Sequence, residues 1–234
     1  MLSLQTSEYV AIVILLLAAY AISATLTQAG QAWLARWLGD DTGERIGWLS
    51  LNPFDHVNLF GAVCVVFLGI GPLRIMPVDY DRFERHEGRL FIVCMGQVII
   101  SIMIAIIAFL LLIIQFGQGL AFILADFQHY LSISQIAQFY PEKSTLSIVF
   151  GLLLVALAIY NLLMASLGFF INIVNYFIIS HYKNGVIAST DLWLGLMMWG
   201  ISLVLVLIFG LALRDFFFKA VIKSVTFICR LFGA

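Results

Sequence analysis

The polar side chains that could do chemistry are few, and most lie inside or beside long apolar runs. Thr27, Gln28 and Gln31 stand together near the end of the first such run. A neutral glutamine cannot act as a general base, and neither glutamine nor threonine makes a competent zinc ligand. Their amide and hydroxyl groups can instead hydrogen-bond between helices, a contact worth about 0.6–2 kcal/mol in a membrane. These positions therefore predict hydrogen bonding between helices.

The histidines and a few asparagines are the remaining candidates. His56 ends the segment Asn52-Pro53-Phe54-Asp55-His56, and a hydrogen-bonded histidine at an interface is the simplest role for it. A metal site that joins His56 to His181 is the alternative. His86 and His129 fall in loops, where solvent exposure is the default. Three asparagines inside an apolar run are expected to bond between helices: Asn161, Asn172 and Asn175.

The composition is that of a polytopic membrane protein. Of the 234 residues, 63% are hydrophobic and 11% are charged, against about 45–50% and about 25% in a soluble domain. Most of the chain therefore has no water to face, and the lipid bilayer is its expected environment. A net charge of −1 gives no electrostatic basis for binding nucleic acid. The sequence predicts an all-α, multi-pass protein of a bacterial inner membrane or an organelle membrane.

Apolar runs near the ~20 residues that a span needs give four expected spanning helices. They cover residues 9–38, 90–116, 146–179 and 191–213, with a C-terminal cap at Gly39 and a break inside the third. Residues 61–73 are apolar but short, so this run either crosses with the help of residues 57–60 or re-enters. The expected total is about 4–6 spans.

The connecting segments carry further expectations. A short extended hairpin or re-entrant region is expected near residues 44–56, and one or two interfacial helices are expected in residues 117–144. The four arginines within residues 74–89 favour the cytoplasmic side for that loop. Residues 214–234 are expected to form an amphipathic helix on the membrane surface. Residues 1–213 are then the transmembrane core.

Residues 24–61 resemble the active-site segment of the site-2 protease family of intramembrane zinc metalloproteases. That family follows its zinc-binding HExxH helix with Ala-Trp, Leu-Gly-Asp and a Gly-x-Leu-x-Leu-Asn-Pro-x-x-His segment. Here the corresponding residues read Gln31-Ala32-Trp33, Leu38-Gly39-Asp40, and GWLSLNPFDHVNLFG from Gly47 to Gly61. The resemblance continues more weakly through residues 76–83, Gly96 and residues 171–175. It implies a site-2-protease-like transmembrane core.

The departures from the family pattern fall on its chemistry. Thr27 and Gln31 stand where the two zinc-binding histidines would be, and Gln28 stands at the catalytic glutamate. Ser180 stands at the aspartate that supplies the third zinc ligand in the family. The resemblance therefore implies a degenerate member with no catalytic residue, no metal ligand and no cofactor, although zinc is the cofactor expected of the family.

Three hypotheses for function follow. The first is a catalytically inactive, site-2-protease-like scaffold or assembly subunit that binds transmembrane helices of other membrane proteins. Six residues are expected to build its structure or binding surface: Asn52, Pro53, His56, Gly61, Asn161 and Asn172. The second is an active intramembrane metalloprotease with non-standard ligands. The third is a small-solute transporter with a cavity lined by Gln28, Gln31, Asn161 and Asn172.

Overall fold

The computed structural model describes residues 6–69, 71–74, 76–83, 87–116 and 144–181, with the single positions 200 and 204. Helices dominate this part of the chain, and no strand occurs within it. The predicted all-α architecture is therefore confirmed for the described residues. The expected interfacial helices of residues 117–144 and the amphipathic tail at 214–234 lie outside them, as does the expected span at 191–213 apart from those two positions.

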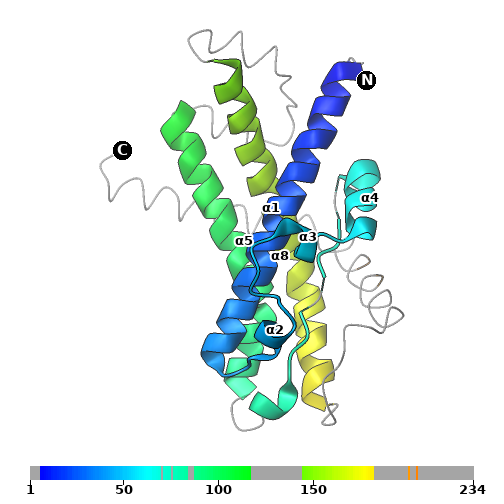
Figure 1. Cartoon of the computed structure of the whole chain (residues 1–234), viewed down its shortest axis with the longest axis vertical. Helices are drawn as coiled ribbons and strands as arrows, with labels where there is room; N and C mark the ends of the chain where they lie inside the picture. Colours follow the sequence, from blue (N-terminus) through cyan, green and yellow to red (C-terminus); the bar gives the residue numbers. More distant parts are fainter. Residues whose placement is uncertain are drawn as a thin grey trace.

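Three long helices form the body of the molecule (Figure 1): α1 (Thr6–Leu38), α5 (Glu87–Phe116) and α8 (Thr145–His181). Each contains a stretch long and apolar enough to cross a membrane, namely Val10–Leu38, Glu87–Phe116 and Thr145–Val174. The described residues therefore hold three candidate spans. This agrees with the prediction of a membrane protein.

The break expected within residues 146–179 is wrong, because α8 is one continuous helix of 37 residues. Its polar residues bond without interrupting it. Asn161 Nδ2 donates to the Leu157 carbonyl at 2.8 Å, and Ser166 Oγ donates to the Leu162 carbonyl at 2.9 Å. Bonds of this kind often bend a helix, but α8 continues through both residues. At ~1.5 Å per residue, α8 is about 55 Å long, which exceeds a ~30 Å hydrocarbon core.

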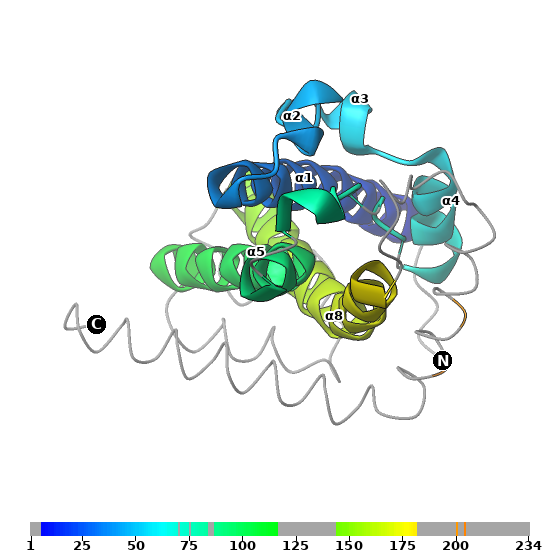
Figure 2. The same cartoon turned by 90° about the horizontal axis from the view of Figure 1, so that it is seen from below.

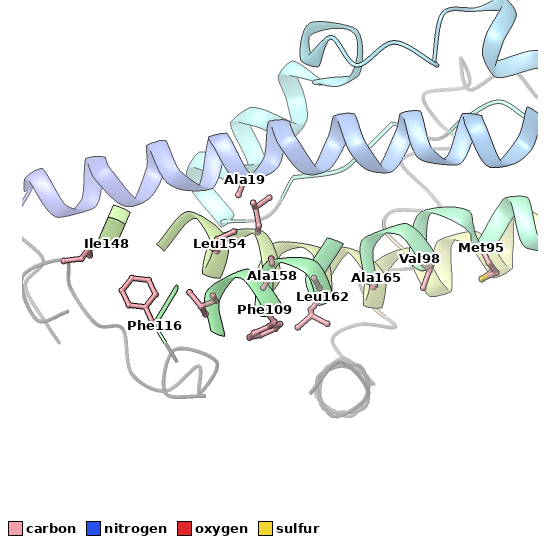
Figure 3. Close-up of a cluster of buried hydrophobic side chains, with 14 residues drawn as sticks. Ala19, Met95, Val98, Phe109, Phe116, Ile148, Leu154, Ala158, Leu162 and Ala165 are labelled. Carbon is pink, nitrogen blue, oxygen red and sulfur yellow. The ribbon is translucent and has the colours of Figure 1, made fainter. Parts of the chain in front are cut away.

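The main apolar core lies between α5 and α8, with Ala19 of α1 at its edge (Figure 3). Phe116 at the end of α5 and Ile148 near the start of α8 belong to the same cluster, so the two helices run antiparallel. Small residues let the backbones approach. A Cβ added at Gly151 would collide with the Phe116 ring. Close approach through small residues is the usual way in which membrane helices associate.

The C-terminal end of α1 is closed by a Schellman motif, as the sequence predicted for Gly39. Gly39 has a φ of 113°, its N–H donates to the Arg36 carbonyl at 3.1 Å, and the Asp40 N–H donates to the Ala35 carbonyl at 2.9 Å. This bond pattern satisfies carbonyls that a helix end otherwise leaves free. The chain therefore leaves α1 sharply at this point.

The extended hairpin expected near residues 44–56 is wrong, because two short helices stand there, α2 (Thr42–Arg45) and α3 (Pro53–His56). Gly47, with a φ of 82°, reverses the chain after α2. The Trp48 N–H then bonds the Gly43 carbonyl at 2.8 Å, so the turn closes onto α2 and pairs with no strand. Asn52 caps α3, since its Oδ1 accepts the Phe54 N–H at 3.2 Å.

The next elements are α4 (Leu59–Leu68) and a 3₁₀ turn, η1 (Tyr80–Phe83). At 10 residues α4 is too short to span a bilayer. Figure 2 shows α2 and α3 on the side of α1 that faces away from α5. We call α2 and α3 the outer layer. The three long helices and the outer layer meet around Thr27, Gln28 and Gln31 of α1.

Candidate functional site

The three α1 residues that the resemblance to site-2 proteases singles out are buried. Thr27, Gln28 and Gln31 are exposed by 0%, 1% and 6%. They lie about 10–17 Å before the end of α1 at ~1.5 Å per residue, within a candidate span. Their surroundings are therefore protein, and the partners of each polar group decide what the site can do.

Gln28 faces His56, which is 1% exposed. Gln28 Oε1 lies 3.3 Å from His56 Nδ1, and Gln28 Nε2 lies 3.5 Å from the His56 carbonyl. His56 Nε2 lies 2.6 Å from the Ser50 carbonyl, so Nε2 must be the donor there, because a carbonyl only accepts. The donor and acceptor roles at Nδ1 depend on the tautomer of the ring.

The His56 ring is also held from its side. The Trp48 ring lies edge-on to it, with 6.2 Å between ring centroids and an interplanar angle of 86°. Both ring nitrogens and this edge contact fix its orientation. His56 thus joins the loop between α2 and α3 to the middle of α1. This agrees with the expectation of a hydrogen-bonded histidine at an interface.

Gln31 joins α1 to α5. Its Nε2 donates to the Val93 carbonyl at 3.0 Å. Gly96 lies one turn further along α5, and a Cβ there would come within 3.1 Å of Gln31 Cγ and of Leu34 Cδ2. Because Gly96 has no side chain, Gln31 has space to pack against α5.

A third polar contact joins α5 to α8. Asn172 Nδ2 donates to Gln97 Oε1 at 3.4 Å, and a Cβ on Gly168 would lie 3.4 Å from the Gln97 amide. Gln97 follows Val93 by one helical turn. The contacts of Gln28, Gln31 and Asn172 therefore tie all three long helices and α3 together near one level. Gln97 was missed as a site residue, although an amide inside an apolar span was a usable signal.

Asn161 belongs to a different contact. Its Nδ2 donates to Ser23 Oγ of α1 at 2.8 Å as well as to Leu157. This confirms that Asn161 bonds between helices and places it about one turn of α1 away from Thr27. Within the described residues, the buried atoms Thr27 Oγ1 and Asn161 Oδ1 have no hydrogen-bond partner.

The other expected structural residues shape the outer layer. Asn52 and Pro53 are exposed and start α3 as cap and first helical residue. Gly61 is buried against α1, where an added Cβ would collide with the Tyr20 hydroxyl and lie 2.6 Å from the Pro72 carbonyl. Tyr20 and Tyr160 were not among the expected residues.

Asp40 organises the polar end of α1. It is fully buried, its Oδ1 accepts the Thr42 N–H at 2.9 Å, and its Oδ2 accepts the Asp79 N–H at 3.1 Å. Beside it, Arg45 donates to Asp41 at 2.6 Å and so lowers the pKa of the Asp41 carboxyl, with a smaller contribution from Arg82 at 3.0 Å. These contacts fix the two ends of residues 40–79 at one place.

Ser180 and His181 form the last turn of α8. Their side chains, like that of Asn175, lie outside what the structure describes, so neither the proposed third-ligand position nor the His56–His181 pair is tested. Tyr176, one turn before Ser180, stacks edge-on with Phe91 of α5 at 5.3 Å between ring centroids.

The donor groups at the family's zinc position do not fit zinc. Thr27, Gln28 and Gln31 offer neutral hydroxyl and amide groups, whereas zinc sites are built from cysteine, histidine and carboxylate ligands. Across the described residues, no three His, Cys, Asp or Glu side chains are grouped so that they could hold a metal ion. No step through a metal can therefore be derived from these residues.

Comparison with known proteins gives one partial match. Over 104 residues, 44% of this chain, the sequence is 29% identical to the protein named "Putative zinc metalloprotease YwhC" from Bacillus subtilis (strain 168). The match covers 48% of that relative, so the chain spans about half its length. No family model matches the chain, and no solved structure matches it significantly. The match supports a site-2-protease-like relationship, and the three apolar helices fit a membrane protein of that kind.

Proposed function

We propose that this protein is a site-2-protease-like membrane protein that binds transmembrane helices of other membrane proteins without hydrolysing them. It acts as a scaffold or assembly subunit of a membrane complex, in a bacterial inner membrane or an organelle membrane. One observation carries the proposal: Gln28 and Gln31, which the resemblance sets at catalytic positions of α1, are buried and bonded to the protein itself.

Gln28 and Gln31 illustrate the argument. Gln28 bonds His56, and Gln31 bonds the Val93 carbonyl. Each amide therefore stabilises the packing of α1, where a protease needs groups free for metal, water and substrate. A glutamine also lacks the basicity to take a proton from water. A binding role requires only that the helices keep their packing. The contacts of Gln28 and Gln31 support such a role.

The alternative of a protease with non-standard ligands rests on His56 and His181. Both ring nitrogens of His56 have partners in the protein, at 3.3 Å and 2.6 Å. To bind a metal, His56 would have to give up one of these bonds. This observation favours the binding role over displaced-ligand hydrolysis.

The transporter alternative needs a water-filled cavity lined by four polar residues: Gln28, Gln31, Asn161 and Asn172. All four are at most 6% exposed, and each bonds another group of the protein. Side chains that bond one another in this way favour packed helices over a pathway. Solute flux into proteoliposomes would support the transporter.

A binding experiment with a fluorescent single-span test helix separates these roles. The full chain in mild detergent is expected to retain the test helix intact on an affinity resin. Recovery of fragments with wild type, and of intact helix with His56→Ala, would favour the protease. Failure to retain any test helix, across helices of several compositions, would contradict the binding role.

A further inference from the structure

Each of the three long helices carries a buried oxygen atom for which the described residues provide no hydrogen-bond partner. These atoms are Thr27 Oγ1 of α1, Ser101 Oγ of α5 and Asn161 Oδ1 of α8. All three side chains are 0% exposed. An unpaired polar atom is costly in a protein interior, and water does not reach it from a lipid environment. The three atoms therefore indicate a bonding group other than the described side chains.

Thr27 and Ser101 lie at nearly the same level of the bundle. A Cβ on Gly30 would lie 3.0 Å from Ile100 Cδ1, so these two residues face each other across α1 and α5. Thr27 precedes Gly30 by three residues, and Ser101 follows Ile100 by one. Because α1 and α5 run antiparallel (Figure 1), both shifts point the same way. At ~1.5 Å per residue, Thr27 and Ser101 are therefore offset by about 3 Å along the bundle.

Asn161 lies about one helical turn from this level. Its Nδ2 donates at 2.8 Å to Ser23 Oγ, and Ser23 precedes Thr27 by four residues on the same face of α1. The orientation of the Asn161 amide is fixed, because Nδ2 also donates to the Leu157 carbonyl at 2.8 Å and a carbonyl only accepts. The unpartnered atom of Asn161 is therefore its oxygen, which needs a donor.

The polar residues next to Thr27 along α1 are bonded directly. Polar residues recur at four-residue steps where the three long helices meet: Ser23, Thr27 and Gln31 on α1, and Gln97 and Ser101 on α5. Ser23 bonds Asn161 at 2.8 Å, and Gln31 bonds the Val93 carbonyl at 3.0 Å. Thr27 lies between these two contacts, and neither its hydroxyl nor that of Ser101 has a partner among the described residues. A bridging group is therefore needed at this level.

Water fits these groups better than a metal cation. Each hydroxyl can donate and accept, the Asn161 oxygen accepts, and a buried water makes about three hydrogen bonds to such groups. Hard metal cations take about six or more oxygen ligands, whereas the described residues offer three unpartnered neutral oxygens here. We propose that Thr27, Ser101 and Asn161 form a buried hydration site, in which ordered water bridges the three long helices. This holds whether or not the protein binds or cleaves other helices.

Nuclear magnetic resonance of the full chain in mild detergent, with labelled threonine methyl groups, detects the water directly. The Thr27 methyl is expected to show a nuclear Overhauser effect from water. Thr25 is the matched control on the same helix, because its Oγ1 donates to the Ala21 carbonyl at 2.8 Å and needs no water. A Thr27 methyl with no more signal from water than the Thr25 methyl would overturn the proposal.

Thr27→Val and Ser101→Ala test whether the two hydroxyls share the water. Each variant removes one bond to it and is expected to lower the unfolding temperature by about 2–4 °C. The double variant is expected to lose less than the sum, because the shared water is lost once. Thr25→Val with Ser101→Ala is the control pair and should be additive. Higher unfolding temperatures in both single variants, or additive losses in the test pair, would contradict the shared water.

A comparison of salts separates water from a bound cation. The unfolding temperature of the wild-type chain is expected to be the same in sodium chloride and in potassium chloride at equal concentration. Thr27→Val is expected to lower it equally in both salts. A higher unfolding temperature in one salt that disappears in Thr27→Val would assign a cation to the site and would overturn the assignment of water.

Discussion

Gln28 and His56 lie 28 positions apart and meet with 3.3 Å between Gln28 Oε1 and His56 Nδ1. The resemblance to site-2 proteases sets Gln28 at the position of their catalytic glutamate. It sets His56 in the segment of this chain that resembles them most. A pair that is buried, hydrogen-bonded and far apart in sequence is a structural link. Gln28 is thus part of the packing between α1 and α3.

The first prediction concerns the stability that this pair provides. Gln28→Ala leaves a buried histidine nitrogen without its partner, which costs about 1–3 kcal/mol of unfolding free energy. The measurement is reversible unfolding in mild detergent. Leu26→Ala, at a position 43% exposed on the same helix, is the control and should change stability by less than about 0.5 kcal/mol. Equal effects of the two substitutions would contradict the structural role.

The second prediction concerns the contact of α1 with α5. Gly96→Ala places a Cβ 3.1 Å from Gln31 Cγ and Leu34 Cδ2, and such overpacking costs about 1–3 kcal/mol. Gly88→Ala, on the same helix with nothing within 4 Å of its added Cβ, should change stability by less than about 0.5 kcal/mol. Thermal unfolding of both variants checks this. A destabilised Gly88→Ala beside an unaffected Gly96→Ala would refute the packing argument.

The third prediction concerns Gly61. A Cβ there collides with the Tyr20 hydroxyl and comes within 2.6 Å of the Pro72 carbonyl, and the carbonyl belongs to backbone that cannot move cheaply. Gly61→Ala should therefore reduce the yield of folded monomer in gel filtration. Tyr20→Phe should rescue it only in part, because the Pro72 carbonyl remains. Val63→Ala, on the exposed face of the same helix, should give wild-type yield.

The fourth prediction concerns acid. Arg45 lowers the pKa of Asp41 below its usual 3.8, so the stabilisation from this pair is complete above 3.8 and is lost as the pH falls through the folded-state pKa. The unfolding temperature of wild type should therefore fall more between about pH 5 and about pH 2 than that of Asp41→Asn. Arg45→Met should reproduce the smaller dependence. An unchanged pH profile in both variants would count against the pair.

The sequence predicted the long helices and the end of α1 because these follow from local signals. Uninterrupted apolar runs predict α1 and α5, and Gly39 marks the point where a left-handed residue is required. It misjudged α8, because Asn161 and Ser166 were read as interruptions, whereas their side chains bond back to the helix or across to α1. Whether an inward polar side chain breaks a helix depends on the partners it finds, and one partner of Asn161, Ser23, lies 138 positions away.

The outer layer was harder to predict for the same reason. Residues 44–56 carry aromatic and aliphatic residues that suit a strand, but no partner strand stands beside them in the described residues. The cap at Asn52 and the reversal at Gly47 favour helical turns instead. The partners of Gln28 and Gln31 lie 28 and 62 positions away, so composition and spacing could indicate that they are buried but could not identify what they bond.

The most direct test of the account is the zinc content and proteolytic activity of the full chain, purified in mild detergent and incubated with a single-span test substrate. We expect far less than one zinc per chain and no cleavage, and Gln28→Ala should behave identically. Stoichiometric zinc with chelator-sensitive cleavage that Gln28→Ala or Gln31→Ala abolishes would contradict it, because these side chains would then serve catalysis and not packing.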